Sequence, residues 1–84
     1  MNSKHLKTLQ TVYALPTIKD LDWKDLETLF TALGAEIIEG DGSRVKFVLN
    51  GKVIRFHRPH KPKTARAYQI ELAREFFESM GIKS

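Results

Sequence analysis

Cysteine is absent from this 84-residue chain. Neither a disulfide framework nor a thiolate metal site is therefore available, and a reducing compartment suits such a chain. No apolar run approaches the roughly 20 residues that a membrane-spanning helix needs, and the N-terminus lacks the apolar core of a signal peptide. We expect a cytoplasmic protein without a membrane segment, folded as one small domain over residues 1–84.

Carboxylates are also missing from residues 42–70, although the chain has ten of them. Eight cations lie in this gap: Arg44, Lys46, Lys52, Arg55, Arg58, Lys61, Lys63 and Arg66. The remaining residues carry six Lys or Arg and all ten acids. Positive charge concentrated on one segment attracts polyanions, so nucleic acid is the first partner to consider.

Two helices are predicted in the first half of the chain. Residues 3–13 have apolar side chains at helical spacing behind a candidate cap at Ser3, and Pro16 ends that segment. The second helix follows Asp22, and Gly34 lies just past its end. Its apolar residues recur at i, i+3, i+4 and i+7: Leu26, Leu29, Phe30 and Leu33.

Three strands are predicted next, over residues 35–39, 44–49 and 52–57. The last two alternate in polarity and are separated by Asn50-Gly51, which is the strongest short-range signal for a β-hairpin. A two-residue turn there fixes the pairing of the strands. It puts Val45, Phe47, Ile54 and Phe56 on one face, which we expect to be the core.

The opposite face of this predicted hairpin is cationic. Lys46 pairs with Arg55 on that face, and Arg44 pairs with His57. Like charges directly opposite each other are destabilising unless a ligand neutralises them, so this pattern favours an anionic partner over a merely solvated surface. A membrane-surface protein would more often carry such cations on an amphipathic helix.

A final helix is predicted over residues 66–80 with Gly81 as its stop. Trp23, Phe76 and Phe77 are interpreted as packing residues. The predicted fold class is α+β with the order (α)αβββα, a three-stranded antiparallel sheet covered by helices on one face.

His57 and His60 are the candidate acid and base of this cationic region. A histidine titrates near neutral pH, so it can take the proton of an RNA 2′-hydroxyl or protonate a leaving 5′-oxygen, while cations stabilise the charged intermediate. The plainer interpretation is that each histidine only packs or binds a carbonyl. A metal site is not expected, because no acid or cysteine accompanies the pair.

Two other features carry less weight. Residues 40–43 form a glycine-rich turn whose amides and Ser43 hydroxyl could meet a phosphate, which alone is a weak signal. Glu36 and Glu39 flank an apolar pair and are interpreted as solvent-facing rather than as a catalytic dyad.

Several short motifs occur in an order that resembles the HicA toxins of HicA–HicB toxin–antitoxin modules. They are Leu33-Gly34-Ala35, Gly42-Ser43 at the start of a strand, Pro59-His60 after the next strand, and Phe76 to Ile82 ending in Gly81-Ile82. The resemblance covers about residues 22–82, and residues 42–45 and 56–60 are similar to a subgroup with an N-terminal extension. We accordingly divide the domain into an extension, 1–21, and a core, 22–82.

The resemblance implies a fold like the double-stranded-RNA-binding domain, cleavage of mRNA without a metal or other cofactor by a histidine that follows Gly-Ser, and inhibition by a HicB-like antitoxin. This chain has Arg44 in place of that histidine, and arginine cannot act as a general base. Either His57, opposite Arg44, supplies the base, or His60 does, or the chain binds RNA without cutting it.

The RNA-binding residues expected from this reasoning are Ser43, Arg44, Lys46, Arg55, Arg58, Lys61 and Lys63. The favoured function is a toxin that acts as a metal-independent endoribonuclease. The alternatives are a non-catalytic RNA-binding module and a protein-interaction domain whose cationic face meets an acidic partner.

Overall fold

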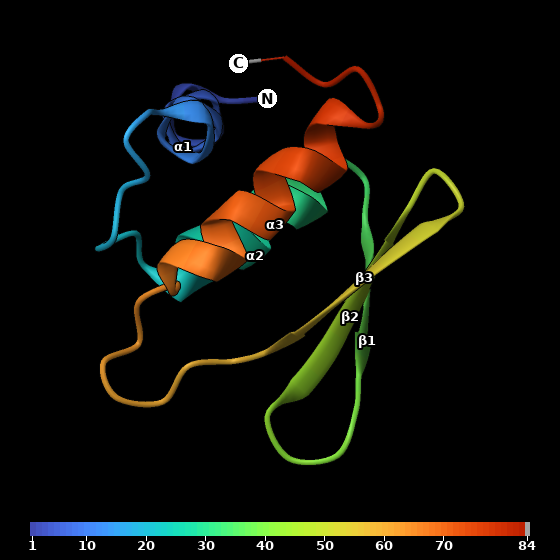
Figure 1. Cartoon of the computed structure of the whole chain (residues 1–84). Coiled ribbons are helices and arrows are strands. Elements are labelled where there is room, and N and C mark those ends of the chain that lie inside the picture. Colours follow the sequence, from blue (N-terminus) through green and yellow to red (C-terminus); the bar gives the residue numbers. More distant parts are fainter. Residues whose placement is uncertain (84) are drawn as a thin grey trace.

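A computed structural model describes residues 1–83 of the chain (Figure 1). Three helices and three strands follow in the order α1 (Ser3–Tyr13), α2 (Trp23–Ala32), β1 (Glu36–Glu39), β2 (Arg44–Leu49), β3 (Lys52–His57) and α3 (Ala67–Glu78). The strands form one antiparallel sheet in the order β1-β2-β3. The predicted α+β class and element order are therefore confirmed.

The ends of the helices follow their sequence signals with small shifts. Asn2, not Ser3, caps α1, and its side-chain oxygen accepts a hydrogen bond from the backbone N–H of His5 at 2.9 Å. Asparagine and serine are about equally good caps, so sequence alone does not choose between neighbouring candidates. Asp22 caps α2 as predicted, and Gly34 follows that helix with a φ of +100°, a conformation that favours glycine.

The β2–β3 hairpin has the predicted register. Val45 pairs with Phe56, Phe47 with Ile54, and Arg44 with His57, as do the other predicted pairs. Asn50 and Gly51 both have positive φ, at 51° and 77°. That is the backbone of a two-residue turn whose twist matches the strands, and Asn-Gly adopts it readily.

The last helix is shorter than predicted. It covers Ala67–Glu78 instead of 66–80, because Arg66 has extended backbone angles and acts as the N-cap. Gly81, with a φ of 73°, lies beyond the end of α3, where a left-handed glycine ends the chain's helical path. The first strand likewise begins at Glu36, one residue later than expected.

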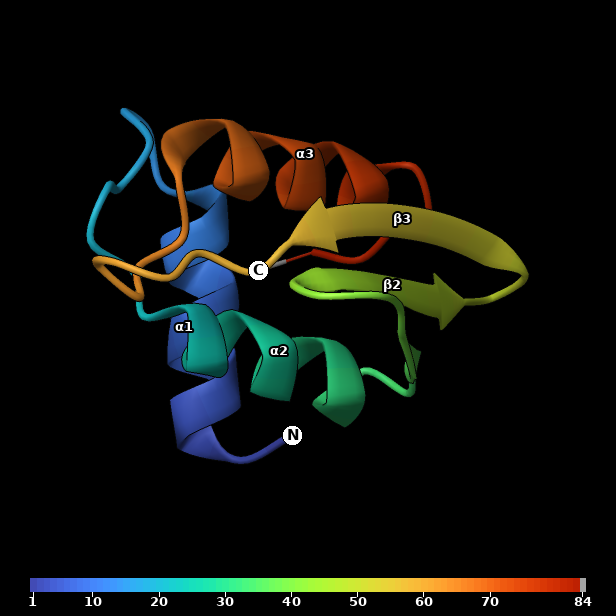
Figure 2. The same ribbon diagram turned by 90° about the horizontal axis from the view of Figure 1, so that it is seen from below.

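The molecule has three layers (Figures 1 and 2). α2 and α3 cover one face of the sheet, and α1 crosses them on the side away from the sheet. Phe30 of α2 stacks on Phe47 of β2 with 4.3 Å between ring centroids, and Phe77 of α3 lies 4.9 Å from Phe30. These buried rings join the sheet to both helices, while the other face of the sheet stays open.

α1 is part of the same hydrophobic core. Leu9 and Val12 are buried in the cluster that also contains the α2 and α3 side chains. Arg74 of α3 donates hydrogen bonds from Nε to the Val12 carbonyl at 2.9 Å and from a terminal nitrogen to Ala14 at 3.3 Å. The Tyr13 hydroxyl also bonds to the carbonyl of Ile82, and burial, with a further contribution from Glu78, raises the pKa of Tyr13.

None of the helices in residues 1–83 has the length and apolar character that crossing a lipid bilayer requires.

Candidate nucleic-acid interface

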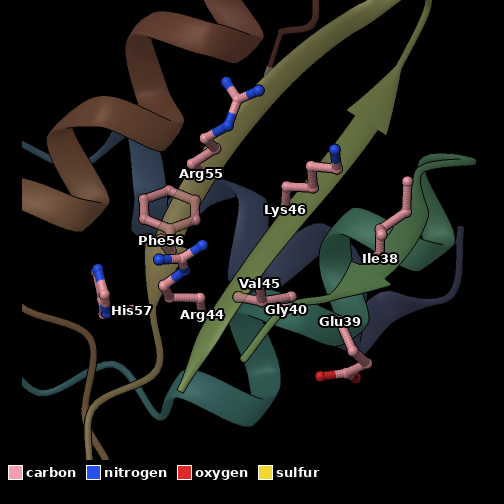
Figure 3. A pocket seen from close by; sticks show the side chains of 9 residues that line it. All are labelled: Ile38, Glu39, Gly40, Arg44, Val45, Lys46, Arg55, Phe56 and His57. Carbon is pink, nitrogen blue, oxygen red and sulfur yellow. The ribbon is translucent and has the colours of Figure 1, made fainter. Parts of the chain in front are cut away.

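The open face of the sheet has a groove of about 440 Å³. It is lined by Arg44 and Lys46 of β2 and by Arg55 and His57 of β3. Gly40 and two residues of β1, Ile38 and Glu39, complete its edge. Figure 3 shows the side chains of Arg44, Lys46 and Arg55 rising from two neighbouring strands. The hairpin register is the cause, because residues that alternate along a strand share one face.

His57 lies at the end of β3, exposed and opposite Arg44. Its ring nitrogen Nδ1 is 3.4 Å from the hydroxyl oxygen of Ser43. A backbone hydrogen bond links the residues just outside this end of the β2–β3 pair, because the N–H of Arg58 donates to the Ser43 carbonyl at 2.8 Å. With Nδ1 beside Ser43, the second ring nitrogen, Nε2, remains available to a ligand.

A second depression, of about 430 Å³, lies at the edge of the sheet beside the start of α3. His60, Lys61 and Arg66 line it together with Ser43 and His57. Among residues 1–83, His57 is the one residue that lines both depressions. The structure thus brings both predicted histidines and the Ser43 hydroxyl to one place, with the cations of the open face on one side of His57.

Arg58 does not face the groove with the other cations. Its guanidinium lies between the carboxylates of Glu27 on α2 and Glu39 on β1, and forms ion pairs with both. These hydrogen bonds, first that of Glu39 and then that of Glu27, raise the pKa of Arg58, and Arg58 lowers the pKa of Glu39. The indole N–H of Trp23 donates to Glu27 at 2.6 Å, which completes the cluster.

This cluster bears on two of the predictions. Glu39 is exposed, as predicted, but it has an ion-pair partner rather than only solvent. Arg58, a predicted RNA ligand, lines the second depression but donates from Nε and both terminal nitrogens to two carboxylates, which leaves it less to offer a phosphate. Within the described part of the chain, its position is that of a structural link between β1, α2 and the loop after β3.

Residues 58–66 connect β3 to α3, and backbone hydrogen bonds fix the part of this loop that precedes α3. Thr64 forms a bridge with Asp22, the N–H of Ala65 donates to Leu21 at 2.8 Å, and Lys63 accepts from Trp23 at 3.1 Å. Lys61 and Lys63 have exposed side chains on this loop. The loop therefore presents His60 and two cations from a fixed base.

Gln69 fastens the two ends of that loop to α3. Its side-chain N–H donates to the carbonyl of His57 at 2.8 Å, and its carbonyl accepts from the backbone N–H of Arg66 at 2.9 Å. The side chain is only 1% exposed, so both bonds are shielded from competing water. Gln69 thereby sets the position of His57 relative to the start of α3.

Sequence reasoning did not find Gln69 or its exposed neighbour Tyr68, which also lines the second depression. Both lie in a predicted helix, where position alone did not distinguish them from packing residues. Among residues 1–83, no cluster of three His, Asp or Glu side chains is placed to hold a metal ion.

These features define a small α+β protein with a cationic open sheet face and two histidines at its edge. The family model described as HicA toxin of bacterial toxin-antitoxin matches residues 23–73, so the chain belongs to the HicA toxin family. Membership implies a toxin role in a toxin–antitoxin module and an antitoxin partner. Comparison with curated proteins and with solved structures gave no match.

Proposed function

We propose that this HicA-family toxin binds mRNA and cleaves it without a metal ion, with His57 as the principal acid–base group. The observation that carries the proposal is the place of His57, which lines both the cationic groove and the histidine-containing depression. An RNA strand that follows the cations across the sheet meets this imidazole where the groove ends.

The cations of the open face supply the electrostatic part of binding. Arg44, Lys46 and Arg55 line the groove with no carboxylate between them on β2 or β3. Phosphate oxygens form short, charge-assisted hydrogen bonds to such groups. In this proposal Arg44 occupies the place of the family's histidine as a phosphate clamp, and Lys61 and Lys63 extend the contact beyond His57.

The chemistry follows from two proton transfers. His57 takes the proton of the 2′-hydroxyl, the 2′-oxygen attacks the adjacent phosphorus, and His60 donates a proton to the departing 5′-oxygen. A 2′,3′-cyclic phosphate and a 5′-hydroxyl are the products. Arg44 stabilises the negative charge that develops on the phosphate oxygens, and Ser43 holds Nδ1 of His57 so that Nε2 faces the substrate.

The antitoxin is proposed to be a HicB-like protein that covers this same surface. A basic face with like charges paired across two strands suits an acidic partner. Such a partner would block the groove and His57 together, and would thereby inhibit the toxin without any change in its shape.

A cleavage assay in the presence of a chelator tests the proposal. Wild type should cut RNA, and His57→Ala should lower the rate by roughly 10²- to 10⁴-fold, the usual contribution of a positioned proton-transfer group. His60→Ala should lower it as well. His5→Ala is the matched control and should retain full activity. His5 belongs to α1, the helix on the side of α2 and α3 away from the sheet (Figures 1 and 2).

A second candidate function, RNA binding without cleavage, is tested by the variant Arg44→His. A HicA-like chain with arginine at this place is a non-catalytic RNA-binding protein if wild type binds RNA but never cuts it. Cleavage gained by Arg44→His, with none in wild type, would favour that alternative over catalysis by His57.

A further inference from the structure

Tyr68 is an exposed aromatic residue in a protein whose other rings are covered. Its side chain is 56% exposed at the start of α3. The other seven aromatic side chains in residues 1–83 are buried or half-buried. Six of them, all but Tyr13, lie in one network of ring contacts: Trp23, Phe30, Phe47, Phe56, Phe76 and Phe77. Tyr68 takes no part in that network, so contacts between aromatic rings do not account for its position.

The position of Tyr68 relates it to the candidate active site. It lines the same depression as His57 and His60. Gln69, its neighbour in the chain, is hydrogen-bonded to the carbonyl of His57 at 2.8 Å. The ring of Tyr68 is therefore carried on backbone whose distance from His57 is fixed by a buried contact.

We propose that Tyr68 is a stacking platform for an unpaired RNA base next to the cleaved phosphate, and that the substrate is consequently single-stranded. The inference rests on the proposed function. Unpaired bases of a single strand can stack on aromatic side chains. The bases of a duplex are already stacked on one another, so their faces are not accessible to a side chain. A ring beside two histidines and a row of cations thus selects for unpaired RNA.

The positive charge around this ring suits an anionic ligand, and an exposed aromatic face beside that charge suits a nucleic-acid base. Arg66 and Lys61 line the same depression as Tyr68, and both have exposed side chains. Acidic side chains begin only at Glu71, further along α3, beside the exposed Leu72. The one aromatic residue that lines the sheet groove within residues 1–83, Phe56, is buried at 4% exposure, whereas the ring of Tyr68 is accessible to a base.

Binding of uncleavable RNA tests this inference. The probes are a labelled 12-nucleotide 2′-O-methyl strand and the duplex that it forms with its 2′-O-methyl complement. Neither probe has an internal 2′-hydroxyl that could attack the phosphate. Tyr68→Leu should weaken binding of the single strand by roughly 5- to 150-fold, the usual range for one base stacked on an aromatic residue. Tyr68→Phe should bind like wild type, and duplex binding should not change in either variant.

Two controls separate stacking from other effects. Leu72→Ala removes an exposed apolar side chain one turn along α3 and should leave RNA binding unchanged. Tyr68→Trp should bind the single strand at least as well as wild type, and its exposed indole should be quenched by the single strand. Trp23 is buried at 6% exposure, so it contributes a constant background to that fluorescence.

The outcomes distinguish this inference from the function on which it rests. Wild type that binds no RNA would overturn both. If wild type binds the single strand and Tyr68→Leu binds it equally well, the stacking role is wrong while RNA binding stands. Equal losses for single strand and duplex, or a loss only in antitoxin binding, would likewise assign Tyr68 a different role.

Discussion

The carboxylate of Glu39 on β1 binds the guanidinium of Arg58 through both of its oxygen atoms. A second carboxylate, that of Glu27 on α2, binds the same guanidinium. Arg58 directly follows His57 in the chain, and its backbone N–H is bonded to Ser43. His57, the candidate base, is therefore next in the chain to an ion-pair cluster of three charged groups, whereas the other ion pair in residues 1–83 joins two.

Glu39→Gln should lower the melting temperature, and the melting temperature of this variant should fall less at acidic pH than that of wild type. Arg58 lowers the folded-state pKa of Glu39, so the ion pair contributes stability above the ordinary glutamate pKa of about 4.3 and loses it as pH falls through the lower folded value. Wild type should consequently lose more stability than Glu39→Gln below about pH 4. Thermal unfolding followed by circular dichroism between pH 2 and 7 measures this difference.

Glu36→Gln is the control for that measurement, because Glu36 lies on the same strand and is exposed without an ion-pair partner in residues 1–83. It should unfold like wild type at every pH. Identical profiles for Glu36→Gln and Glu39→Gln would show that the Arg58 cluster does not stabilise the fold.

We propose that residues 1–21 are an integral part of the domain rather than an appendage. Leu9 of α1 is 1% exposed within the common core, whereas Leu6 on the same helix is 44% exposed. Leu9→Ala should cost about 2–5 kcal/mol of unfolding free energy, as buried leucines do, and Leu6→Ala less than about 1 kcal/mol. Urea denaturation measures both, and equal small losses would mean that α1 packs only loosely.

Arg74 should be a stabilising link between α3 and the end of α1. Besides its bonds to Val12 and Ala14, it donates to the hydroxyl of Thr17 at 2.9 Å. Arg74→Met removes charged donors from carbonyls at a helix end and should cost about 1–3 kcal/mol. Lys24→Met, an exposed charge loss on α2, should change the denaturation midpoint little; a similar loss in both variants would count against the link.

Local signals were sufficient to predict the hairpin but not the cluster beside it. Asn50-Gly51 fixes the register of β2 and β3 because both residues accept positive φ and the turn admits only one pairing. The placement of His57 opposite Arg44 follows directly. Helix boundaries were less certain, since neighbouring polar residues compete as caps, as Asn2 and Ser3 do.

Contacts between distant segments account for what the sequence did not reveal. Arg58 meets Glu27 and Glu39 only once α2 packs on the sheet, and no spacing rule links these three positions. Gln69 resembles an ordinary helical glutamine until its two buried partners are known. The one available hint for Tyr68 was its place directly after Arg66-Ala67 at the end of the carboxylate-free segment, away from the apolar face of α3.

Gln69→Leu should impair cleavage more than it impairs folding. It leaves the His57 carbonyl and the Arg66 N–H without their buried partner, and each such loss costs about 1–3 kcal/mol. The freed loop should lower the cleavage rate of fully folded protein while RNA affinity changes little, since the cations stay in place. Gln69→Glu keeps an acceptor for Arg66 but has no donor for His57, so its ionised form should repeat the catalytic defect.

Thr8→Val is the matched control for Gln69→Leu. Thr8 is also a buried polar residue, at 7% exposure, and its hydroxyl bonds to Lys4 within α1, remote from His57. Its cleavage rate per folded molecule should equal that of wild type. If Thr8→Val and Gln69→Leu lose activity only in proportion to their unfolded fraction, Gln69 has no special role in positioning His57.

Arg55→Gln should weaken RNA binding without weakening the fold. Arg55 lies directly opposite Lys46 on the open face, and like charges so placed repel each other by a few tenths of a kcal/mol. Removing one of them should leave the unfolding free energy unchanged or slightly higher, while the slope of log affinity against log salt falls by about one unit.

Lys24→Gln removes the same charge from α2 and should leave that slope as in wild type. A stabilised variant with an unaltered slope would mean that Arg55 does not contact phosphate. A lower RNA affinity with a reduced slope would mean that Arg55 does contact phosphate, and that the repulsion between Lys46 and Arg55 is retained because both cations serve RNA binding.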